Sequence, residues 1–569
     1  MTEQISFTIL SYVVFGFILI IGGYLFGKAF YKIYNGEAVL FKKTSTRIEN
    51  GIFKFIGVEK EEEMSAKKYV ISLVLFSLIS FLILFIMFLI QGILTLNPNG
   101  LGNIEWSLAF NTAWSFVTNT NWQAYSGELT MSNFSQIFGL TVQNFISGAV
   151  GIAVLFALIR GFTRKESKTI GNFYVDIVRI ILFMLPICFI GALILVSEGV
   201  PQTFGSNVLY QGLDGSSGTI YLGPAASQII IKQLFTNGGG FYGANSAYPL
   251  ENPTILSNVF ECACIVWIPS GLCFTFGLAI KNKEKTEKIK HKNQGIILLK
   301  AMTIIFVVCL IVTTVCEYII NLNLPENVKT IGNMEGKEVR FGISLSSLWA
   351  VVTTAASNGS VNAMHDSFTS IGGMIPLFLM MLGEIVYGGV GSGLCGMIAF
   401  ALLTVFIAGL MVGRTPEYVG KKIGSFDMKM VCLVILPPVL LTLLGSASSI
   451  ILTSNSVVNS GAHGFSEILY AFASMANNNG SAFAGFNANT TFVNVFGGII
   501  MVLVRFIPMI AIIFLASSLA KKKIVPETDG TLKTDNALFV GLLIAVILII
   551  GALSFFPSLA LGPLAEFFS

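Results

Sequence analysis

The sequence predicts an all-α membrane protein that crosses the bilayer ten times. Hydrophobic residues make up 54% of the chain and charged residues 11%, whereas a soluble domain carries about 25% charged residues. The apolar residues form runs long enough to span a bilayer, which takes about 20 residues of helix. One of these runs, 71–95, carries no charge. The basic residues also gather in alternate connections, as they do in multi-span proteins.

Ten apolar segments follow one another along the chain. The predicted spans lie near 5–26, 69–95, 135–159, 172–197, 255–280, 296–320, 372–412, 428–452, 490–519 and 537–556. Most lysines and arginines fall in the connections 27–68, 160–170, 281–300, 413–429 and 520–536. We therefore expect these connections on the cytoplasmic side and both termini outside.

Each of the four long outside connections contains a short semi-apolar stretch and then a small polar segment. We name these segments the first to fourth polar loops: 118–121 (TNTN), 236–239 (TNGG), 357–360 (SNGS) and 478–481 (NNGS). Aligned on one asparagine in each loop, they recur at intervals of 118, 121 and 121 residues; the aligned residues are Asn119, Asn237, Asn358 and Asn479. A near-constant interval is typical of a repeated unit.

The interval predicts four fused repeats, each made of a span, a short pore helix, a polar loop and a second span. The repeats occupy 66–165, 170–282, 294–414 and 427–521. The first span (1–30) and the last span (535–569) flank them.

The composition of the polar loops favours a selectivity filter for a monovalent cation. Non-helical backbone at membrane depth must line a cavity or be buried in protein. Four such loops around one axis would supply rings of carbonyl oxygens, with Thr and Ser hydroxyls, that replace the ion's hydration shell. The loops contain no carboxylate, which argues against a divalent ion. The candidate ion-binding residues are Thr118, Asn119, Thr120, Asn121, Thr236, Asn237, Gly238, Gly239, Ser357, Asn358, Gly359, Ser360, Asn478, Asn479, Gly480 and Ser481.

The polar loops also fit two simpler interpretations. Each loop alone is typical of a surface turn, and Asn358 and Asn479 each begin a glycosylation sequon. Four loops at one interval favour the filter over turns, and a glycan there would block it.

Several segments resemble the potassium-binding A subunit of the bacterial Kdp potassium-transporting ATPase. They are TNTNWQ at 118–123, FTNGGGF at 235–241, NSAYPLENPT at 245–254, SNGS at 357–360, GEIVYGGVGSG at 383–393, VGRTPEYVGKKI at 412–423 and NNGSAFAG at 478–485. The resemblance implies a fold like that of potassium channels and the potassium-transporter superfamily. It also implies that Gln123, Gly240 and Phe241 lie beside the filter, that K+ enters from outside, and that K+ is the only metal bound.

The same resemblance implies a bacterial inner-membrane complex, surrounded by lipid and without nucleic acid. Its partners would be a P-type ATPase catalytic subunit, a single-span C subunit and a small F subunit. The chain lacks both a D-K-T-G-T motif and a phosphate-binding G-x-x-x-x-G-K-[ST] loop. We therefore expect no bound nucleotide and no enzymatic activity of its own. The alternative is a self-sufficient channel-like uptake protein for K+ or Na+, gated by a cytoplasmic regulatory ring.

Segment 372–412 is about twice as long as one crossing needs, and it is rich in glycine. The glycines are Gly388, Gly389, Gly391, Gly393 and Gly396. Each costs up to about 1 kcal/mol in a helix interior. This favours a broken helix that forms a gate beneath the filter, although close helix packing also uses glycine.

Charged residues inside spans cost at least about 2.5–3.5 kcal/mol and are functional candidates. Glu384 and Arg505 both fall near mid-depth, so we expect them to face the ion path, where they could pair and where Arg505 would divert cations sideways. A structural ion pair is the alternative. Asp176 and Arg179, three residues apart, are expected to pair with each other. Arg414 and Glu417 lie in an inside loop that would dock a partner or simply be solvated.

Overall fold

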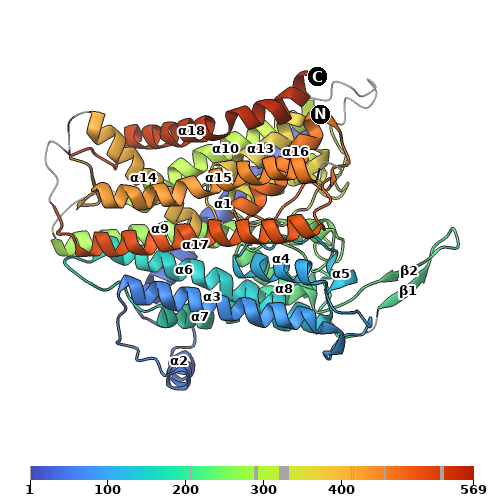
Figure 1. The fold of residues 1–569 in the computed structure, drawn as a ribbon, viewed down its shortest axis with the longest axis horizontal. Coiled ribbons are helices and arrows are strands. Elements are labelled where there is room, and N and C mark those ends of the chain that lie inside the picture. Colours follow the sequence, from blue (N-terminus) through green and yellow to red (C-terminus); the bar gives the residue numbers. More distant parts are fainter. Residues whose placement is uncertain are drawn as a thin grey trace.

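The computed structural model describes residues 2–205, 207–287, 293–319, 332–411, 413, 415–453, 456–525 and 531–569. Within these residues, ten helices are long and apolar enough to cross a membrane, and each overlaps a predicted span (Figure 1). They are α1 (Thr2–Tyr34), α3 (Ala66–Leu89), α6 (Val142–Thr163), α7 (Phe173–Ser197), α9 (Ile255–Glu287), α10 (Gln294–Ile319), α14 (Ser392–Met411), α15 (Ser425–Leu452), α17 (Thr491–Lys521) and α18 (Ala537–Leu559).

The four short outside helices predicted before the polar loops are also present. They are α4 (Trp106–Val117), α8 (Ala225–Leu234), α12 (Gly342–Ala355) and α16 (Gly461–Ala476). The first ends directly before its polar loop, and in the other three a single residue separates helix and loop. We call them the pore helices from here on.

The remaining elements are short, and they either connect the spans or continue the spans of α6 and α18. They are α2 (Lys42–Ile56), α5 (Gly127–Thr130), α13 (Ser370–Met381), α19 (Ala565–Phe568), the 3-10 turns Gln91–Ile93, Asn245–Ala247 and His365–Ser367, the π-helical segments Ser135–Thr141 and Ala560–Leu564, and the strands β1 (Val208–Gln211), β2 (Ser217–Ile220), β3 (Glu417–Tyr418) and β4 (Lys421–Lys422). β1 pairs with β2 and β3 with β4, both antiparallel.

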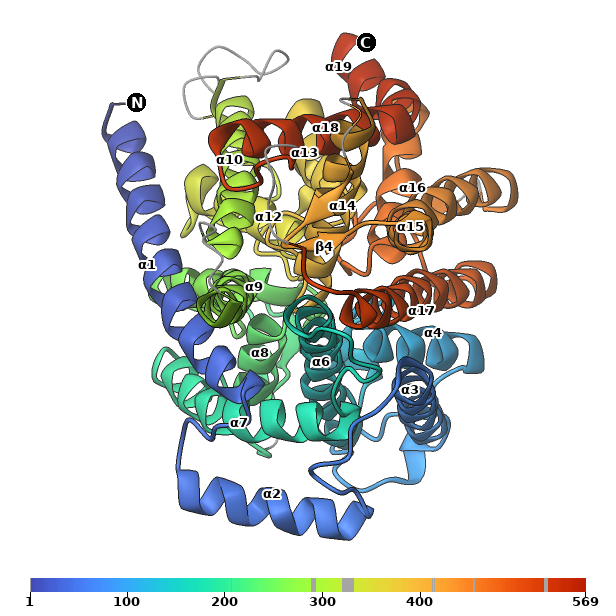
Figure 2. The ribbon, with the colours of Figure 1, turned by 90° about the vertical axis from the view of Figure 1, so that its left-hand side faces the viewer.

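The spans run side by side, and both termini lie at one end of the bundle (Figure 1). The β1–β2 hairpin projects from this same end, and α4, α8 and α16 lie toward it. Helix α2 lies beside the bundle, toward the opposite end (Figure 1), and runs across the direction of the spans (Figure 2). Helix α2, which belongs to the basic connection 27–68, therefore lies away from the end that holds α4, α8 and α16.

The bundle is most deeply buried at its centre. α6 and α9 are the spans with the largest buried share, whereas α1 and α15 expose most of their apolar residues. Exposed apolar side chains such as Phe17 and Leu25 suit a lipid environment. α6 lies at the centre of the bundle (Figure 2) and contacts the first polar loop, where Asn144 Oδ1 accepts from Asn121 Nδ2 at 2.7 Å.

The predicted break in segment 372–412 is confirmed. α13 ends at Met381 and α14 begins at Ser392. Between them, five of the connecting residues have a positive φ: Gly383, Glu384, Tyr387, Gly388 and Gly391. This left-handed backbone is not compatible with a continuous helix.

The predicted pair between Asp176 and Arg179 is wrong. Asp176 instead accepts two hydrogen bonds from Arg160 of α6, at 2.6 and 2.7 Å. Arg179 donates to Glu49 of α2 at 2.9 Å. Tertiary packing gives each charge a partner on a neighbouring helix, which the spacing within α7 does not reveal. The bond from Arg179 also fixes α2 against α7.

Candidate ion-binding site

The four polar loops share one backbone conformation. In each loop two residues with positive φ flank a central residue; these pairs are Asn119 and Asn121, Thr236 and Gly238, Ser357 and Gly359, and Asn478 and Gly480. The N–H of each central residue donates to a carbonyl oxygen five residues earlier, at 2.9 Å in every loop; the bonds are Thr120 to Ser115, Asn237 to Lys232, Asn358 to Thr353, and Asn479 to Ser474.

This shared conformation corrects the alignment made from the sequence. The residue equivalent to Asn237, Asn358 and Asn479 is Thr120, not Asn119. The intervals between central residues are therefore 117, 121 and 121. The sequence misled because the first loop places an asparagine on each side of Thr120. The first loop thus lacks the asparagine that the other three have at the centre.

Contacts between the loops close into a ring. A Cβ atom added to Gly238 would lie 1.7 Å from the carbonyl oxygen of Asn358. The same atom on Gly359 would lie 2.2 Å from that of Asn479, and on Gly480 2.2 Å from that of Thr120. The second loop therefore abuts the third, the third abuts the fourth, and the fourth abuts the first.

The remaining junction, between the first and second loops, is made by side chains. Asn119 Nδ2 donates to the carbonyl oxygen of Thr236 at 2.9 Å, and Asn121 Nδ2 donates to that of Gly238 at 3.0 Å. Four loops thus surround one axis, and the carbonyls of three central residues lie against a glycine of the neighbouring loop. None of the loop residues is charged. Such an arrangement of backbone oxygens suits a dehydrated monovalent cation.

The asparagine side chains hold the loops in place. Asn358 Nδ2 donates to the carbonyl oxygen of Lys232 at 3.2 Å, and Asn479 Nδ2 to that of Thr353 at 3.1 Å. Both bonds reach the pore helix that precedes the neighbouring polar loop: α8 for Asn358 and α12 for Asn479. Both asparagines are fully buried, so neither sequon is accessible to a glycan.

The residues predicted beside the filter lie next to the polar loops. Gln123 Oε1 accepts from the N–H of Gly240 at 2.8 Å, and Gln123 Nε2 donates to its carbonyl oxygen at 3.0 Å. The carbonyl oxygen of Phe241 accepts from Gln136 Nε2 at 3.2 Å. The first repeat thereby fixes the backbone that follows the second polar loop.

The non-helical segment 382–391 lies directly against the polar loops. The N–H of Gly388 donates to the carbonyl oxygen of Ala355, the last residue of α12, at 3.0 Å. The N–H of Val390 donates to Thr236 Oγ1 at 2.9 Å. Gly391 approaches α6 so closely that a Cβ atom there would lie 2.1 Å from the carbonyl oxygen of Gly151. The glycines therefore allow this segment to pack closely against α6, and they also allow the break between α13 and α14.

A cavity of about 110 Å³ adjoins the polar loops, and both Glu384 and Arg505 line it together with Ser357 and Asn478. Both charged side chains are buried. Within the described residues, neither carboxylate oxygen of Glu384 has a hydrogen-bond partner, and no ion pair joins it to Arg505. The suggested pairing is thus not observed, although the two side chains share one cavity. The cavity also reaches residues of the outer helices α15 and α18.

Comparison with known proteins decides the family. A family model described as "Potassium-transporting ATPase A subunit" matches residues 13–568. The chain belongs to this family. It is 55% identical to a potassium-transporting ATPase potassium-binding subunit of Clostridium botulinum (strain Eklund 17B / Type B), over 98% of this chain and 99% of that one. It is 53% identical to a subunit of the same name from Listeria monocytogenes serotype 4b (strain CLIP80459), over 95% of each chain.

A solved structure has the same fold. The potassium transporter TrkH from Vibrio parahaemolyticus superposes with a TM-score of 0.53 and covers 87% of this chain and 97% of its own. The two sequences are 14% identical, so the likeness concerns the fold alone. The predicted fold class, a multi-span helical protein of the potassium-transporter kind, is confirmed.

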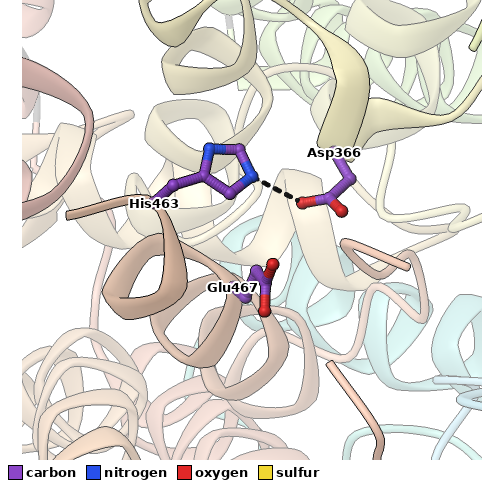
Figure 3. A group of neighbouring side chains, drawn as sticks. All are labelled: Asp366, His463 and Glu467. Atoms are coloured by element: carbon purple, nitrogen blue, oxygen red, sulfur yellow. Dashed lines mark hydrogen bonds and ion pairs between the residues drawn. The ribbon is translucent and has the colours of Figure 1, made fainter. Parts of the chain in front are cut away.

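The chain also carries one cluster that sequence spacing did not reveal. Asp366, His463 and Glu467 place ligand atoms within 4.8 Å of one another (Figure 3). His463 Nε2 lies 3.0 Å from Asp366 Oδ1, and its Nδ1 lies 3.0 Å from Glu566 Oε1. Hydrogen bonds to Asp366 and then to Glu566 raise the pKa of His463 to about 10. The imidazolium therefore links α16 to the loop after the third polar loop and to α19.

In the described part of the basic connection between α14 and α15, residues 418–421 are buried. Glu417 lies half-buried in β3, whereas Arg414, the other predicted docking residue, lies outside the described residues. Lys421 of β4 is buried and donates to the carbonyl oxygens of Arg164 at 2.6 Å and Lys522 at 2.9 Å. Burial, followed by the positive charges of Lys283 and Lys522, lowers the pKa of Lys421 to about 7.

Proposed function

We propose that the chain is the potassium-binding, channel-like translocation subunit of an ATP-driven potassium uptake complex. The closed ring of four uncharged polar loops carries this proposal, since carbonyl oxygens can replace the hydration shell of K+. K+ would be the transported ion and the only metal at the filter. Membership of the A subunit family and the TrkH-like fold support the same function.

The chain is divided, in this proposal, into four repeats with a span at either end. The repeats are 66–165, 170–282, 294–414 and 427–521, and the flanking spans fall in 1–30 and 535–569. Each repeat contains a span, a pore helix, a polar loop and a second span. The four pore helices all direct their C-terminal ends, with partial negative charge, at the ring, which favours a cation there.

Hydrolysis of ATP would take place on a partner. The relatives are named as subunits of a potassium-transporting ATPase, and this chain has neither the D-K-T-G-T phosphorylation motif nor the phosphate-binding G-x-x-x-x-G-K-[ST] loop. The proposed partners are the P-type ATPase catalytic subunit, a single-span C subunit and a small F subunit. The complex would sit in the bacterial inner membrane with both termini of this chain outside. A self-sufficient channel is the disfavoured alternative, since the relatives carry the name of an ATPase subunit.

The decisive assay is ATP hydrolysis by the purified complex. We expect stimulation by K+ at low concentration, weaker stimulation by Rb+ and little by Na+. Equal stimulation by Na+ would contradict potassium selection. Ion flux through liposomes containing this chain alone would instead support the self-sufficient channel.

Below the ring, we propose that the ion passes through the cavity toward the outer helices. Arg505 puts a positive charge in this cavity and so opposes passage of a cation straight to the cytoplasm. The segment 382–391, which contains Gly388, Gly389, Gly391 and Glu384, would act as the gate because it is bonded to the pore regions of both the second and third repeats.

The role of Arg505 can be tested with two variants of the complex. Arg505→Ala should lower the number of K+ ions transported per ATP, because the barrier to the cytoplasm is lost. Arg505→Lys keeps the charge and should retain most of the coupling. Unchanged coupling in Arg505→Ala would refute the diversion of the ion.

A further inference from the structure

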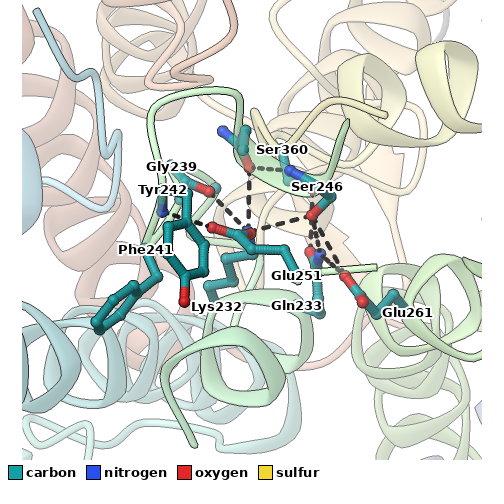
Figure 4. A network of polar contacts seen from close by, with 12 residues as sticks. Lys232, Gln233, Gly239, Phe241, Tyr242, Ser246, Glu251, Glu261 and Ser360 are labelled. Atoms are coloured by element: carbon teal, nitrogen blue, oxygen red, sulfur yellow. Dashed lines mark hydrogen bonds and ion pairs between the residues drawn. The ribbon is translucent and has the colours of Figure 1, made fainter. Parts of the chain in front are cut away.

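Lys232 is a buried cation directly behind the second polar loop (Figure 4). It lies in the last turn of α8. Its Nζ donates to the carbonyl oxygen of Gly239 at 3.0 Å and to Asn245 Oδ1 at 3.0 Å, and it forms an ion pair with Glu251 Oε2. A buried ammonium is costly unless it is paired and hydrogen-bonded. Here it has both an anion and a loop carbonyl.

Glu251 holds the other end of the same stretch of backbone. Its Oε1 accepts from the N–H of Tyr242 at 2.8 Å. The ion pair therefore holds this backbone by two hydrogen bonds, one from Lys232 to Gly239 and one from Tyr242 to Glu251. Between these two points, Gly240 has its N–H and carbonyl oxygen bonded to Gln123.

The second polar loop needs such restraint more than the others. It runs into three successive glycines, Gly238, Gly239 and Gly240, and the other three polar loops contain no such run. Glycine loses more conformational freedom on ordering than any other residue. Gly238 and Gly239 also adopt positive φ. Side-chain bonds therefore have to supply the stiffness that the backbone itself lacks.

The bond from Lys232 has counterparts in two other repeats. Ser115 Oγ donates to the carbonyl oxygen of Trp122 at 2.9 Å, again seven residues ahead. In the third repeat, Trp349 Nε1 donates to the equivalent carbonyl oxygen, that of Ser360, at 2.8 Å. A pore-helix side chain thus anchors the same loop carbonyl three times. The donor is charged in the second repeat and neutral in the first and third.

We propose that Lys232 and Glu251 form a strut that fixes the second polar loop and thereby sustains discrimination between K+ and Na+. The inference rests on the proposed function of the ring as a potassium filter. Lys232 is a positioning residue that acts through the Gly239 carbonyl and does not bind the ion itself. If the loop were free, the ring could contract around the smaller Na+, and the preference for K+ would fall.

The test uses the complete ATPase complex and the double variant Lys232→Met/Glu251→Gln. This variant removes both charges together, so neither member of the pair is left as an unmatched buried ion, and Gln still offers an oxygen to Tyr242. The measured quantity is the Na+ concentration that gives half-maximal ATPase stimulation, divided by the corresponding K+ concentration. We expect this ratio to fall at least about tenfold, because the loss of one hydrogen bond to a charged group has roughly this effect. Lys232→Arg, which keeps a cationic donor, should retain part of the ratio.

A second buried pair provides the matched control. Lys337 Nζ lies 2.7 Å from Glu317 Oε2, and both side chains are fully buried. The described bonds of Lys337 go to Glu317 and Glu335 and not to a polar loop. Lys337→Met/Glu317→Gln should lower thermal stability but leave the ion ratio unchanged.

Two results would overturn the strut: a wild-type ratio in Lys232→Met/Glu251→Gln, or an equal loss in the control pair. If a variant assembles poorly, its protection from thermal unfolding replaces the ATPase assay. The concentrations of NaCl and KCl that give half-maximal protection then supply the same ratio. Failure of the proposed function looks different, because the wild-type complex itself would then not respond to K+.

Discussion

Substituting Gly359 by alanine should weaken K+ binding far more than its effect on stability explains. Gly359 has a φ of +86°, so alanine there adopts the left-handed conformation, at a cost of about 1–2 kcal/mol. In addition, its Cβ atom would lie 2.2 Å from the carbonyl oxygen of Asn479. This carbonyl must retreat by at least about 1.2 Å to reach an ordinary van der Waals contact, which moves one oxygen of the ring.

The loss of affinity can be bounded. We take one displaced carbonyl as comparable to one hydrogen bond to a charged group, about 1.5–3 kcal/mol. This corresponds to roughly 10- to 150-fold weaker K+ binding. The measurement is the K+ concentration that gives half-maximal ATPase stimulation of the complex.

Gly342→Ala is the matched control. Gly342 precedes the same polar loop and has a φ of +62°. Among the described residues, and apart from its chain neighbours and its own helix backbone, no atom lies within 4 Å of the position that an alanine Cβ would take there. The variant should lose the same stability from its left-handed backbone, about 1–2 kcal/mol, without a change in half-maximal K+ concentration. An unchanged K+ concentration in Gly359→Ala, or an equal shift in both variants, would refute the ring of carbonyls.

Two further predictions concern charges away from the ring. Asp176→Asn leaves Arg160 with an unmatched buried charge and should destabilise the chain by about 3–5 kcal/mol; Glu63→Gln, at a more exposed pair with Arg164, should cost less than about 1 kcal/mol. Thermal unfolding in detergent compares the two, and equal melting shifts would count against the first. His463 has a folded-state pKa raised to about 10, so its stabilising contribution is complete below about pH 6.5 and is lost as the pH rises through about 10. The stability difference between wild type and His463→Gln should therefore shrink from pH 7 to about 10.5, and a constant difference would contradict a charged His463.

Much of the site was predictable because it depends on local composition. The polar loops stand out as uncharged, glycine- and asparagine-containing segments at a regular interval, and the break in segment 372–412 follows from its length and glycine content. What the interval left open was the register of the first loop. TNTN offers two asparagines. The positive φ of Asn119 and Asn121, together with the hydrogen bond from Thr120 to Ser115, shows that Thr120 is central.

The sequence by itself determined the ten spans, the short pore helices and the polar loops that follow them. The spans can be predicted because a helix in lipid satisfies its own backbone hydrogen bonds. Each span therefore consists of one continuous apolar run of about 20 residues. Tertiary structure alone decided the partners: Asp176 with Arg160, His463 between Asp366 and Glu566, and Lys232 with Glu251 and a loop carbonyl. These contacts join separate elements of the chain, and which helix faces which depends on packing between the elements rather than on spacing along one of them.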